Sequence, residues 1–434
     1  MAACALSAAR TRDGAPLTTV RRANRHEHTS SETYYAAARD AFPDELLAAR
    51  GLHYLRACAL LSLCCIQNGN IEAMNLHLGQ YMALSNIQRL HDEAHWPENI
   101  TNIEKEERRR LFWSMYTLDV YSSVVWNGPF HCQEAHAKVR YPVELDDELI
   151  APDASPMDGG KTCWLQGWNF TTDLYRVLEQ ATTRARKRRQ PSNGMFAMRQ
   201  LFGQDLYSGD SILQNVMDIY HLLPAVFREI SPVTGDRHKD IFGFQAANIQ
   251  ATLALLRMVF FSIEENQNVE RKCDVANELL SVFHSVPAAY LRAISTPLIY
   301  HLGSIGQILG SVMEGLLSEN SYQQVRMMLL SMADLLERLE SGLERAAGAS
   351  RDLRKQVDKI EEYMRTQRLI LDTLDMSRNV APNEGIQTLD SVVADGFESG
   401  VPQFQLPPEL LVEWMWPLDL TQDYPLFPAN EFTQ

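Results

Sequence analysis

Cysteine and histidine are the side chains in this sequence that could hold a metal ion. A two-zinc cluster needs bridging thiolates in two closely spaced sets. The seven cysteines form no C-x-x-C pair and are scattered, at Cys4, Cys58, Cys64, Cys65, Cys132, Cys163 and Cys273. The adjacent pair lies in the apolar run 57–66, where a free thiol behaves as a small hydrophobe. We therefore expect buried structural thiols in a reducing compartment, and no metal cofactor in this chain.

Histidine spacing offers one further metal candidate. His91 and His95 stand at i and i+4, but Pro97 follows at once and the local pattern places no third ligand. We interpret the pair as a polar helix end. The sequence also lacks a G-x-G-x-x-G motif, a P-loop, a G-x-S-x-G elbow and an H-E-x-x-H motif. We expect that the protein is not an enzyme, although a helical enzyme without familiar motifs stays a rival interpretation.

One helix must position the most distinctive residues of the chain. Residues 104–127 contain no Gly or Pro, and Leu111, Met115 and Leu118 recur at i, i+4 and i+7. Further apolar residues spread around the helix, which indicates neighbours on several sides. Asp119 then needs a partner, because burying an unpaired carboxylate is costly. We expect a structural ion pair with another element, for which Arg56 and Arg89 are the candidates.

The rest of the chain reads as helix after helix, which predicts an all-α, multi-helix bundle. We expect domains at 1–31 (a disordered basic arm), 32–378 (a helical regulatory domain) and 379–434 (an acidic and aromatic tail). Apolar seams at 325–339 and 353–374 predict an antiparallel hairpin joined at Gly348, with an intermolecular coiled coil as the alternative. The helices are expected at 32–67, 71–89, 105–126, 164–187, 212–227, 244–266, 272–283, 296–317, 323–345 and 352–374.

The helix at 104–127 carries a block of arginines and aromatics that is quite specific. With the Gly-Pro pair and the proline that follow it, this block resembles the fungal-specific transcription factor domain, the middle regulatory region of zinc binuclear-cluster activators. The likeness spans roughly residues 32–178. The residues that carry it are Glu106, Arg108, Arg109, Arg110, Phe112, Trp113, Tyr116, Asp119, Gly128, Pro129 and Pro142.

Two departures from that family are visible. Lys138 and Arg140 stand where the family usually has acidic residues, which puts any contact made by those carboxylates in doubt. The zinc-cluster module that the family places before this domain is also missing from the sequence. The resemblance therefore implies that DNA is reached through a missing or partner-supplied module, and that zinc belongs to that module alone.

The last segment of the chain has a separate composition. Residues 381–434 contain no Lys or Arg and hold nine acidic residues in a protein of net charge −15. Prolines interrupt any long helix, and repulsion between carboxylates keeps large apolar side chains solvated, which is typical of a disordered activation segment. A strap that packs back on the domain is the alternative. The candidate residues for binding coactivator grooves are Trp414, Trp416, Leu418, Leu420, Tyr424 and Phe427.

A short basic run follows the helix expected at 164–187. Cations suit a helix C-terminus, yet this run has more of them than a cap requires. We expect either a nuclear-import signal or a phosphate-contacting patch, with a solvated helix end as the alternative. The candidates are Arg184, Arg186, Lys187, Arg188 and Arg189.

Together these features predict a nuclear regulator of RNA polymerase II transcription that controls a metabolic or biosynthetic gene set. The alternative is a helical cofactor or repressor without its own DNA-binding module. The resemblance implies coactivator partners and allows a small-molecule effector and a homodimer. No signal peptide is evident at the first residues, and no apolar run is long enough to span a bilayer, so we expect no membrane contact.

Overall fold

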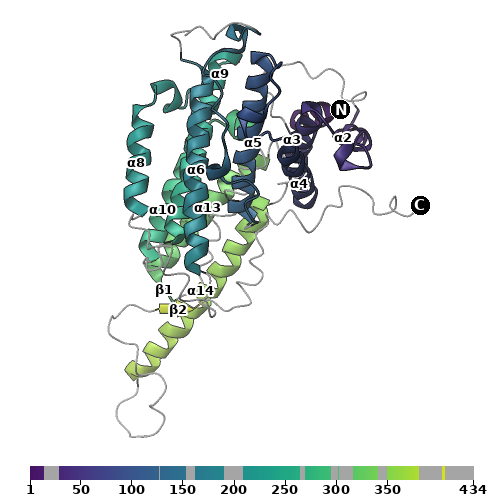
Figure 1. The fold of residues 1–434 in the computed structure, drawn as a ribbon. Helices are drawn as coiled ribbons and strands as arrows, with labels where there is room; N and C mark the ends of the chain where they lie inside the picture. The colour runs from purple at the N-terminus through teal and green to yellow at the C-terminus, as the bar shows by residue number, and fades with distance from the viewer. Residues whose placement is uncertain are drawn as a thin grey trace, which may run out of the picture. The chain divides into compact units, whose positions relative to one another are not determined.

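A computed structural model of the 434-residue chain describes residues 1–13, 29–126, 128–152, 162–189, 209–263, 269–294, 302, 316–340, 349–380 and 403–405. The predicted all-α class is confirmed (Figure 1), with one short two-stranded ladder added. Contacts divide the chain into two compact units. The first contains the helices from α1 to α9 together with α11, and the second contains α13, α14 and both strands.

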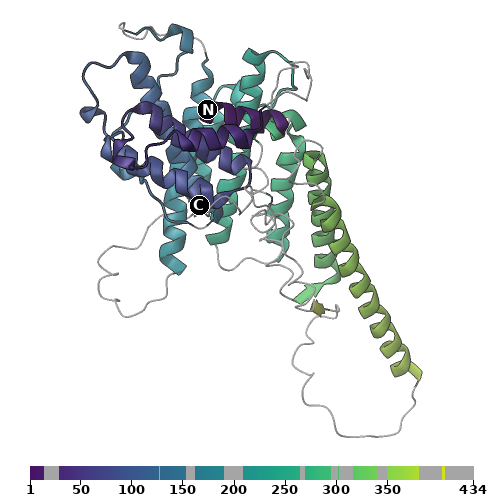
Figure 2. The same cartoon turned by 90° about the vertical axis from the view of Figure 1, so that its right-hand side faces the viewer.

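The first four helices form one layer of the first unit. They are α1 (Ala2–Arg12), α2 (Ser31–Asp40), α3 (Leu52–Gln67) and α4 (Ile71–Ile87). The α3 helix packs against α1 and α4, and α1 also packs against α2 (Figure 2). Side chains cap the N-termini of α2 and α4. Ser30 accepts a hydrogen bond from the N–H of Thr33 at 3.2 Å, and Asn70 accepts one from the N–H of Ala73 at 2.9 Å.

The single helix expected at 32–67 is wrong, because the chain leaves helical geometry between α2 and α3. Pro43 lies just after α2 and lacks the N–H that a helix needs. Gly51 has φ of 101°, a conformation that side chains disfavour, and it starts α3. Most of residues 32–67 are therefore helical as predicted, but they form two helices separated by the turn Leu46–Ala48.

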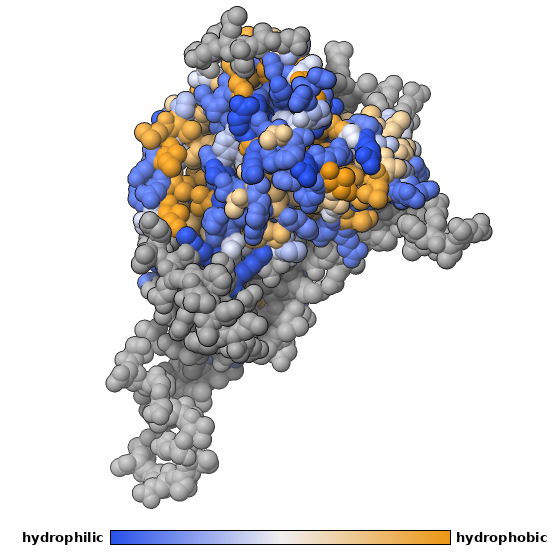
Figure 3. All heavy atoms as spheres, viewed as in Figure 1, coloured by the Kyte–Doolittle hydropathy of each residue, from blue (hydrophilic) through white to orange (hydrophobic). Residues whose placement is uncertain are grey.

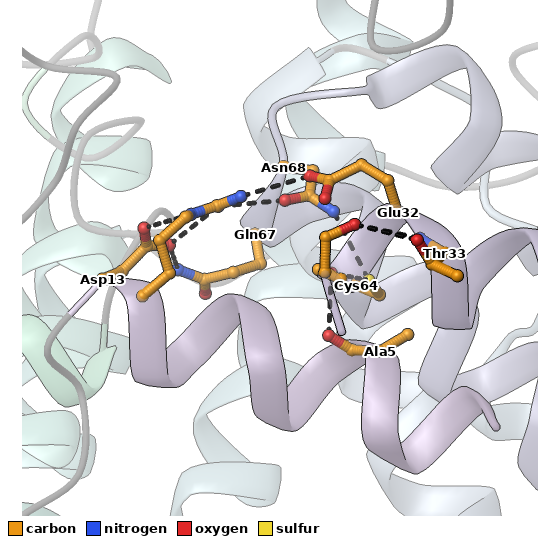
Figure 4. Close-up of polar contacts among 10 residues, drawn as sticks. Ala5, Asp13, Glu32, Thr33, Cys64, Gln67 and Asn68 are labelled. Atoms are coloured by element: carbon orange, nitrogen blue, oxygen red, sulfur yellow. Dashed lines mark hydrogen bonds and ion pairs between the residues drawn. The ribbon is translucent and has the colours of Figure 1, made fainter. Parts of the chain in front are cut away.

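The prediction of a disordered arm is also wrong for residues 2–12. Ala2, Ala5 and Ala9 are buried along one face of α1, where their small side chains allow close packing on α3. Polar contacts fix the helix at its end, where Gln67 donates a hydrogen bond to Asp13 (Figure 4). The other arginines of the expected arm, at positions 21, 22 and 25, lie outside the described residues.

A second layer of the first unit is built on long helices. The α6 helix (Trp164–Arg189) packs against both α5 (Asn102–Trp126) and α9 (Arg237–Ile263), as Figure 1 shows. Gly167 of α6 allows the ring of Phe227 in η6 (Ala225–Phe227) to approach closely, because an added Cβ would lie 2.6 Å from a ring carbon of Phe227. The remaining elements of this region are η2 (Glu93–His95), η3 (Glu134–His136), η4 (Asp147–Leu149), α8 (Gly209–Leu222), η6 (Ala225–Phe227) and α11 (Ala288–Ile294).

The second unit contains the predicted antiparallel hairpin, which is confirmed. The helices α13 (Glu319–Glu340) and α14 (Ala349–Val380) pack along their apolar seams. Arg326 pairs with Glu361 at 3.0 Å, and Arg354 pairs with Asp334 at 2.6 Å. Because the later residue of α13 pairs with the earlier residue of α14, the two helices are antiparallel. Figure 2 shows them side by side. The strands β1 (Leu316–Ser318) and β2 (Gln403–Gln405) are antiparallel, while α10 (Val269–Ser285) spans the division between units. The expected turn at Gly348 and most of the expected helix at 296–317 lie outside the described residues.

The face of the molecule in Figure 3 is mostly hydrophilic, with apolar side chains gathered over α8. Ile219, Leu222 and Val226 are exposed on α8 and the turn after it. Single exposed apolar residues are ordinary on protein surfaces. Among the helices described, none combines the length and the apolar character that crossing a bilayer requires.

Candidate functional site

The block of arginines and aromatics lies on α5, the helix that the sequence predicts most clearly. Thr101 precedes the helix and accepts a hydrogen bond from the N–H of Glu104 at 3.2 Å, which satisfies one free donor of the first turn. Phe112, Trp113 and Tyr116 are buried, so the aromatic part of the block is core. The predicted burial of this helix is therefore confirmed, and its polar groups must find partners inside the fold.

The three consecutive arginines of α5 bind three different parts of the chain. Arg108 donates to Glu104 of its own helix at 3.0 and 2.7 Å. Arg109 makes a two-pronged contact with Glu93 of η2, at 2.8 Å for each nitrogen, and it also bonds Glu106. Arg110 pairs with Asp147 of η4 at 2.7 Å. The block thus acts as a set of tethers that hold neighbouring turns against one helix.

Glu93 joins α5 to the segment that follows it. Besides Arg109, it accepts the backbone N–H of Arg140 at 2.8 Å and the Arg140 Nε at 3.1 Å. Burial raises the pKa of Glu93, but the hydrogen bonds from Arg109 and Arg140 outweigh that effect and lower the pKa to about 2. Glu106 makes a parallel contact, because its Oε2 accepts the N–H of Val143 at 2.9 Å.

The two basic departures from the family pattern both find carboxylates. Lys138 lies 3.7 Å from Asp92, and Arg140 pairs with Glu93. Backbone bonds add to this pairing, since the Lys138 N–H donates to His91 at 2.8 Å. The segment after the Gly-Pro pair is therefore held beside residues 91–93, which follow α4. In this chain the basic residues Lys138 and Arg140 make these contacts.

Asp119 is fully buried, and its partner is a turn instead of an arginine. The carboxylate accepts the backbone N–H groups of His131 at 2.8 Å and Cys132 at 2.9 Å. Its other oxygen lies 2.7 Å from His131 Nδ1. The expectation of Arg56 is wrong, because that residue pairs with Glu107. Arg89 instead adopts φ of 50° in the exposed turn after α4.

This contact also perturbs the imidazole. The hydrogen bond to the Asp119 carboxylate raises the pKa of His131, outweighing the opposite effect of partial burial. His131 is partly exposed, so protons from solvent reach it. The site thus places a partly exposed imidazole beside a fully buried carboxylate.

The remaining residues of the block close the same region. Trp113 Nε1 donates to the carbonyl of Arg140 at 3.0 Å, and Tyr116 Oη donates to Glu179 of α6 at 2.7 Å. Gly128 accepts from Ser123 at 2.7 Å, and the Pro142 carbonyl accepts from Asn169 at 3.2 Å. The other proline of the motif, at position 129, is exposed. All but that proline therefore lie in the core or in polar contacts, which are made within α5 or join it to η2, η4, α6 and residues 128–145.

Sequence reasoning missed the contribution of α6. Arg176 contacts Glu134 at 2.6 Å and Asp173 at 2.9 Å, and it also donates to the Tyr141 hydroxyl at 3.1 Å. Glu179 accepts the N–H of Glu134 at 3.0 Å as well as the tyrosine of the block. The i, i+3 spacing of Asp173 and Arg176 was the one local signal, because the other partners lie far away in the sequence.

A cavity of about 230 Å³ adjoins the turn at His131. His91 and His136 also line it, together with the aromatic side chains of Phe112 and Tyr116. His91 Nδ1 is buried and has no hydrogen-bond partner among the described residues. His95 points elsewhere and pairs with Asp92 at 3.1 Å. In the described part of the chain, no group of three or more ligating side chains is arranged to hold a metal ion.

The other predicted site residues are only partly described. Arg186 donates to the Ser123 carbonyl at 2.7 Å and lies 5.0 Å from the ring centre of Phe130, so this cation of the basic run faces the protein. Arg184 is half-buried. The side chains of the cations at 187–189 lie outside the described residues, as do all the candidate activation residues of the tail.

Comparison with known proteins identifies relatives among yeast regulators. Pyrimidine pathway regulatory protein 1 of Saccharomyces cerevisiae is 29% identical over 122 residues, which are 28% of this chain and 13% of that protein. The S. cerevisiae protein named as transcriptional regulatory protein YJL206C is 37% identical over 51 residues, 12% of this chain and 7% of that protein. The chain thus matches only a small part of either relative. No solved structure matches the chain.

A sequence model of the fungal specific transcription factor domain matches residues 1–272. This match covers more than half of the 434 residues, begins with α1 and includes the whole network around α5. The resemblance carried by the arginine and aromatic block is therefore confirmed, and the chain belongs to the family of the fungal specific transcription factor domain.

Proposed function

We propose that the chain is a nuclear regulator that controls transcription of a metabolic or biosynthetic gene set by RNA polymerase II. Its family membership supports this function. The observation that carries the proposal is the use of the motif on α5, whose charged side chains join η2, η4 and residues 128–145 to one helix. Such a network stabilises the arrangement of the helices in the regulatory domain. It explains the arginine block as a structural feature, without a role in catalysis.

The tail at 379–434 is the part of the chain that we propose contacts coactivators. Its acidic residues keep Trp414, Trp416 and Phe427 available to apolar grooves, and binding can order a short turn around them. In this proposal the helical domain holds the tail in one of two states, and an effector or partner shifts the balance between them.

DNA contact in this proposal comes from a zinc-cluster module or a partner protein. The cysteines of this chain have no spacing that builds such a cluster, so the zinc belongs to that other module. A homodimer suits this arrangement, since paired modules read paired half-sites. The basic run at 184–189 is proposed to serve nuclear import.

A reporter assay tests the function. The 434-residue chain is fused to a heterologous DNA-binding domain, and transcription is measured from a promoter that carries its sites. We expect output well above that of the DNA-binding domain alone, and we expect the double change Trp414→Ala and Trp416→Ala to remove most of it. A matched control changes Trp126→Ala, a half-buried tryptophan at the end of α5, outside the tail.

Other outcomes of this assay distinguish the rival functions. Output below that of the DNA-binding domain alone favours a repressor or cofactor over an activator. Output equal to that domain alone, from a fusion that is folded and nuclear, contradicts the proposal. Retained output in the double tryptophan variant assigns the tail to a structural role.

A further inference from the structure

A cavity lies where the two layers of the first unit meet. Its volume is about 570 Å³, which falls within the roughly 300–1,000 Å³ of pockets that enclose small molecules. Helices α1, α3, α5, α6, α9 and α11 all contribute to its wall. Most lining side chains are apolar or aromatic, among them Leu63, Leu111, Met115, Tyr121 and Trp168.

Arg10 of α1 supplies a positive charge to this cavity. Arg10 is an exposed residue near the end of α1, and no carboxylate in the described part of the chain pairs with it. The other arginine of the wall, Arg56, differs because Glu107 neutralises it. An exposed guanidinium that lines a largely apolar cavity can pair with a single anionic group.

The position of Arg10 is fixed by the docking of its helix. Ser31 donates a hydrogen bond to the Ala5 carbonyl at 2.8 Å, and Arg12 donates to Asn68 at 3.0 Å. Figure 4 shows these contacts between α1 and the residues near Cys64 of α3. The helix that carries the cation therefore stays in place without a ligand, which lowers the entropic cost of binding one.

Gln245 of α9 supplies a second unsatisfied polar group to the same cavity. Its side chain is only 3% exposed, and its Oε1 has no hydrogen-bond partner among the described residues. A buried acceptor without a partner costs free energy, and a ligand hydroxyl or N–H group would remove that cost. This amide is thus evidence for a ligand site in the cavity that does not depend on Arg10.

We propose that this cavity binds a small monocarboxylate with a largely apolar body, whose carboxylate pairs with Arg10 and whose donor group bonds Gln245. The lining supports both parts of this choice. Arg10 is the lining cation that no described carboxylate pairs with, and it matches one anionic group. The apolar side chains favour a hydrophobic body. A polyphosphate or nucleic acid fits poorly, since its affinity depends on many cations. The site extends beyond the regulatory function proposed above, and its occupancy can be measured without any transcription assay.

Calorimetric titration of the full chain tests the site with 2-naphthoate and its uncharged methyl ester. We expect the acid to bind about tenfold more tightly than the ester, because only the acid forms a charge-assisted pair. Arg10→Met should remove that preference. The matched control is Arg39→Met on α2, whose exposed partner Asp40 lies outside the cavity wall, and it should leave the preference intact.

Two more variants keep the test decisive. Ser114→Phe fills the cavity from the exposed side of α5 and should abolish binding of both probes without unfolding the chain. 6-Hydroxy-2-naphthoate should bind more tightly than 2-naphthoate, and Gln245→Leu should cancel that gain. Equal affinity of acid and ester, an unchanged preference in folded Arg10→Met, or no saturable binding of either probe overturns the proposal. An equal gain in Gln245→Leu removes that residue from the site.

Discussion

The Asp119 carboxylate and the His131 imidazole lie 2.7 Å apart, and the carboxylate also holds the turn that carries His131 by its backbone N–H. One buried side chain on α5 therefore fixes both the position of a loop and the charge of its histidine. This relationship gives Asp119 a role that its helix alone could not reveal.

Replacing Asp119 is expected to destabilise the protein strongly. Asp119→Ala leaves the N–H groups of His131 and Cys132 buried without acceptors, which should lower the free energy of unfolding by about 3–5 kcal/mol. Asp119→Asn keeps one acceptor oxygen and should cost clearly less. Urea denaturation followed by circular dichroism measures both. Equal losses in the two variants would show that the turn does not depend on these acceptors.

The His131 pair predicts a pH dependence of stability. Because the folded pKa of His131 is raised above its unfolded value, its contribution is full below that unfolded value of about 6.5 and disappears as pH rises through the folded pKa. The difference in unfolding free energy between the natural chain and His131→Asn should therefore shrink as pH rises above about 6.5. Denaturation at several pH values checks this. A constant difference would separate the histidine from the stability of the loop.

Glu93 predicts the opposite dependence, at lower pH. Its folded pKa of about 2 lies below the ordinary value of 4.5, so its contribution is present above 4.5 and disappears as pH falls toward 2. At pH 7, Glu93→Gln should cost about 2–3 kcal/mol of unfolding free energy, and the cost should vanish in acid. The exposed Glu98→Gln serves as the control and should cost little. A cost for Glu93→Gln that persists at pH 2 would assign its effect to packing.

Arg89 offers a stabilising change. It is an exposed residue with φ of 50°, which disfavours any side chain with a Cβ. Arg89→Gly should be more stable than Arg89→Ala by about 1 kcal/mol, although both remove the same guanidinium. Thermal and urea unfolding of the two variants gives the comparison. An alanine variant of equal stability would mean that the turn adopts another conformation.

Two neighbouring methionines test the hairpin of the second unit. Met328 is fully buried, while Met327 is 59% exposed on the same helix. Met328→Ala should lower the unfolding free energy by about 2–4 kcal/mol, and Met327→Ala should change it by well under 1 kcal/mol. Differential scanning calorimetry of both variants measures this. Similar effects would place the apolar seam elsewhere on α13.

The parts of the fold that the sequence predicts are those with a regular local pattern of apolar residues. The α5 helix has good formers and a threonine cap, and the α13–α14 hairpin has regular apolar seams, so both follow from spacing along the chain. The α1 helix was missed because its arginines suggested a solvated arm. Its alanines at 2, 5 and 9 have the spacing of one helix face, and this spacing is the sequence signal for a packed helix.

The site is harder to predict, because its partners are distant in sequence. Tyr116 and Glu179 are 63 residues apart, and Asp119 is satisfied by backbone N–H groups that carry no residue signature. Arg56 and Arg89 were reasonable partners on charge alone, yet a turn supplies the donors instead. Cavity walls made by six helices leave no local spacing at all.

We propose that the helical domain governs the activity of the acidic tail. The most direct measurement compares reporter transcription from two fusions to one heterologous DNA-binding domain, the isolated segment 381–434 and the full 434-residue chain. We expect strong activation by the isolated segment and weaker activation by the full chain at equal protein level. An isolated segment that gives no transcription above the DNA-binding domain alone would contradict it.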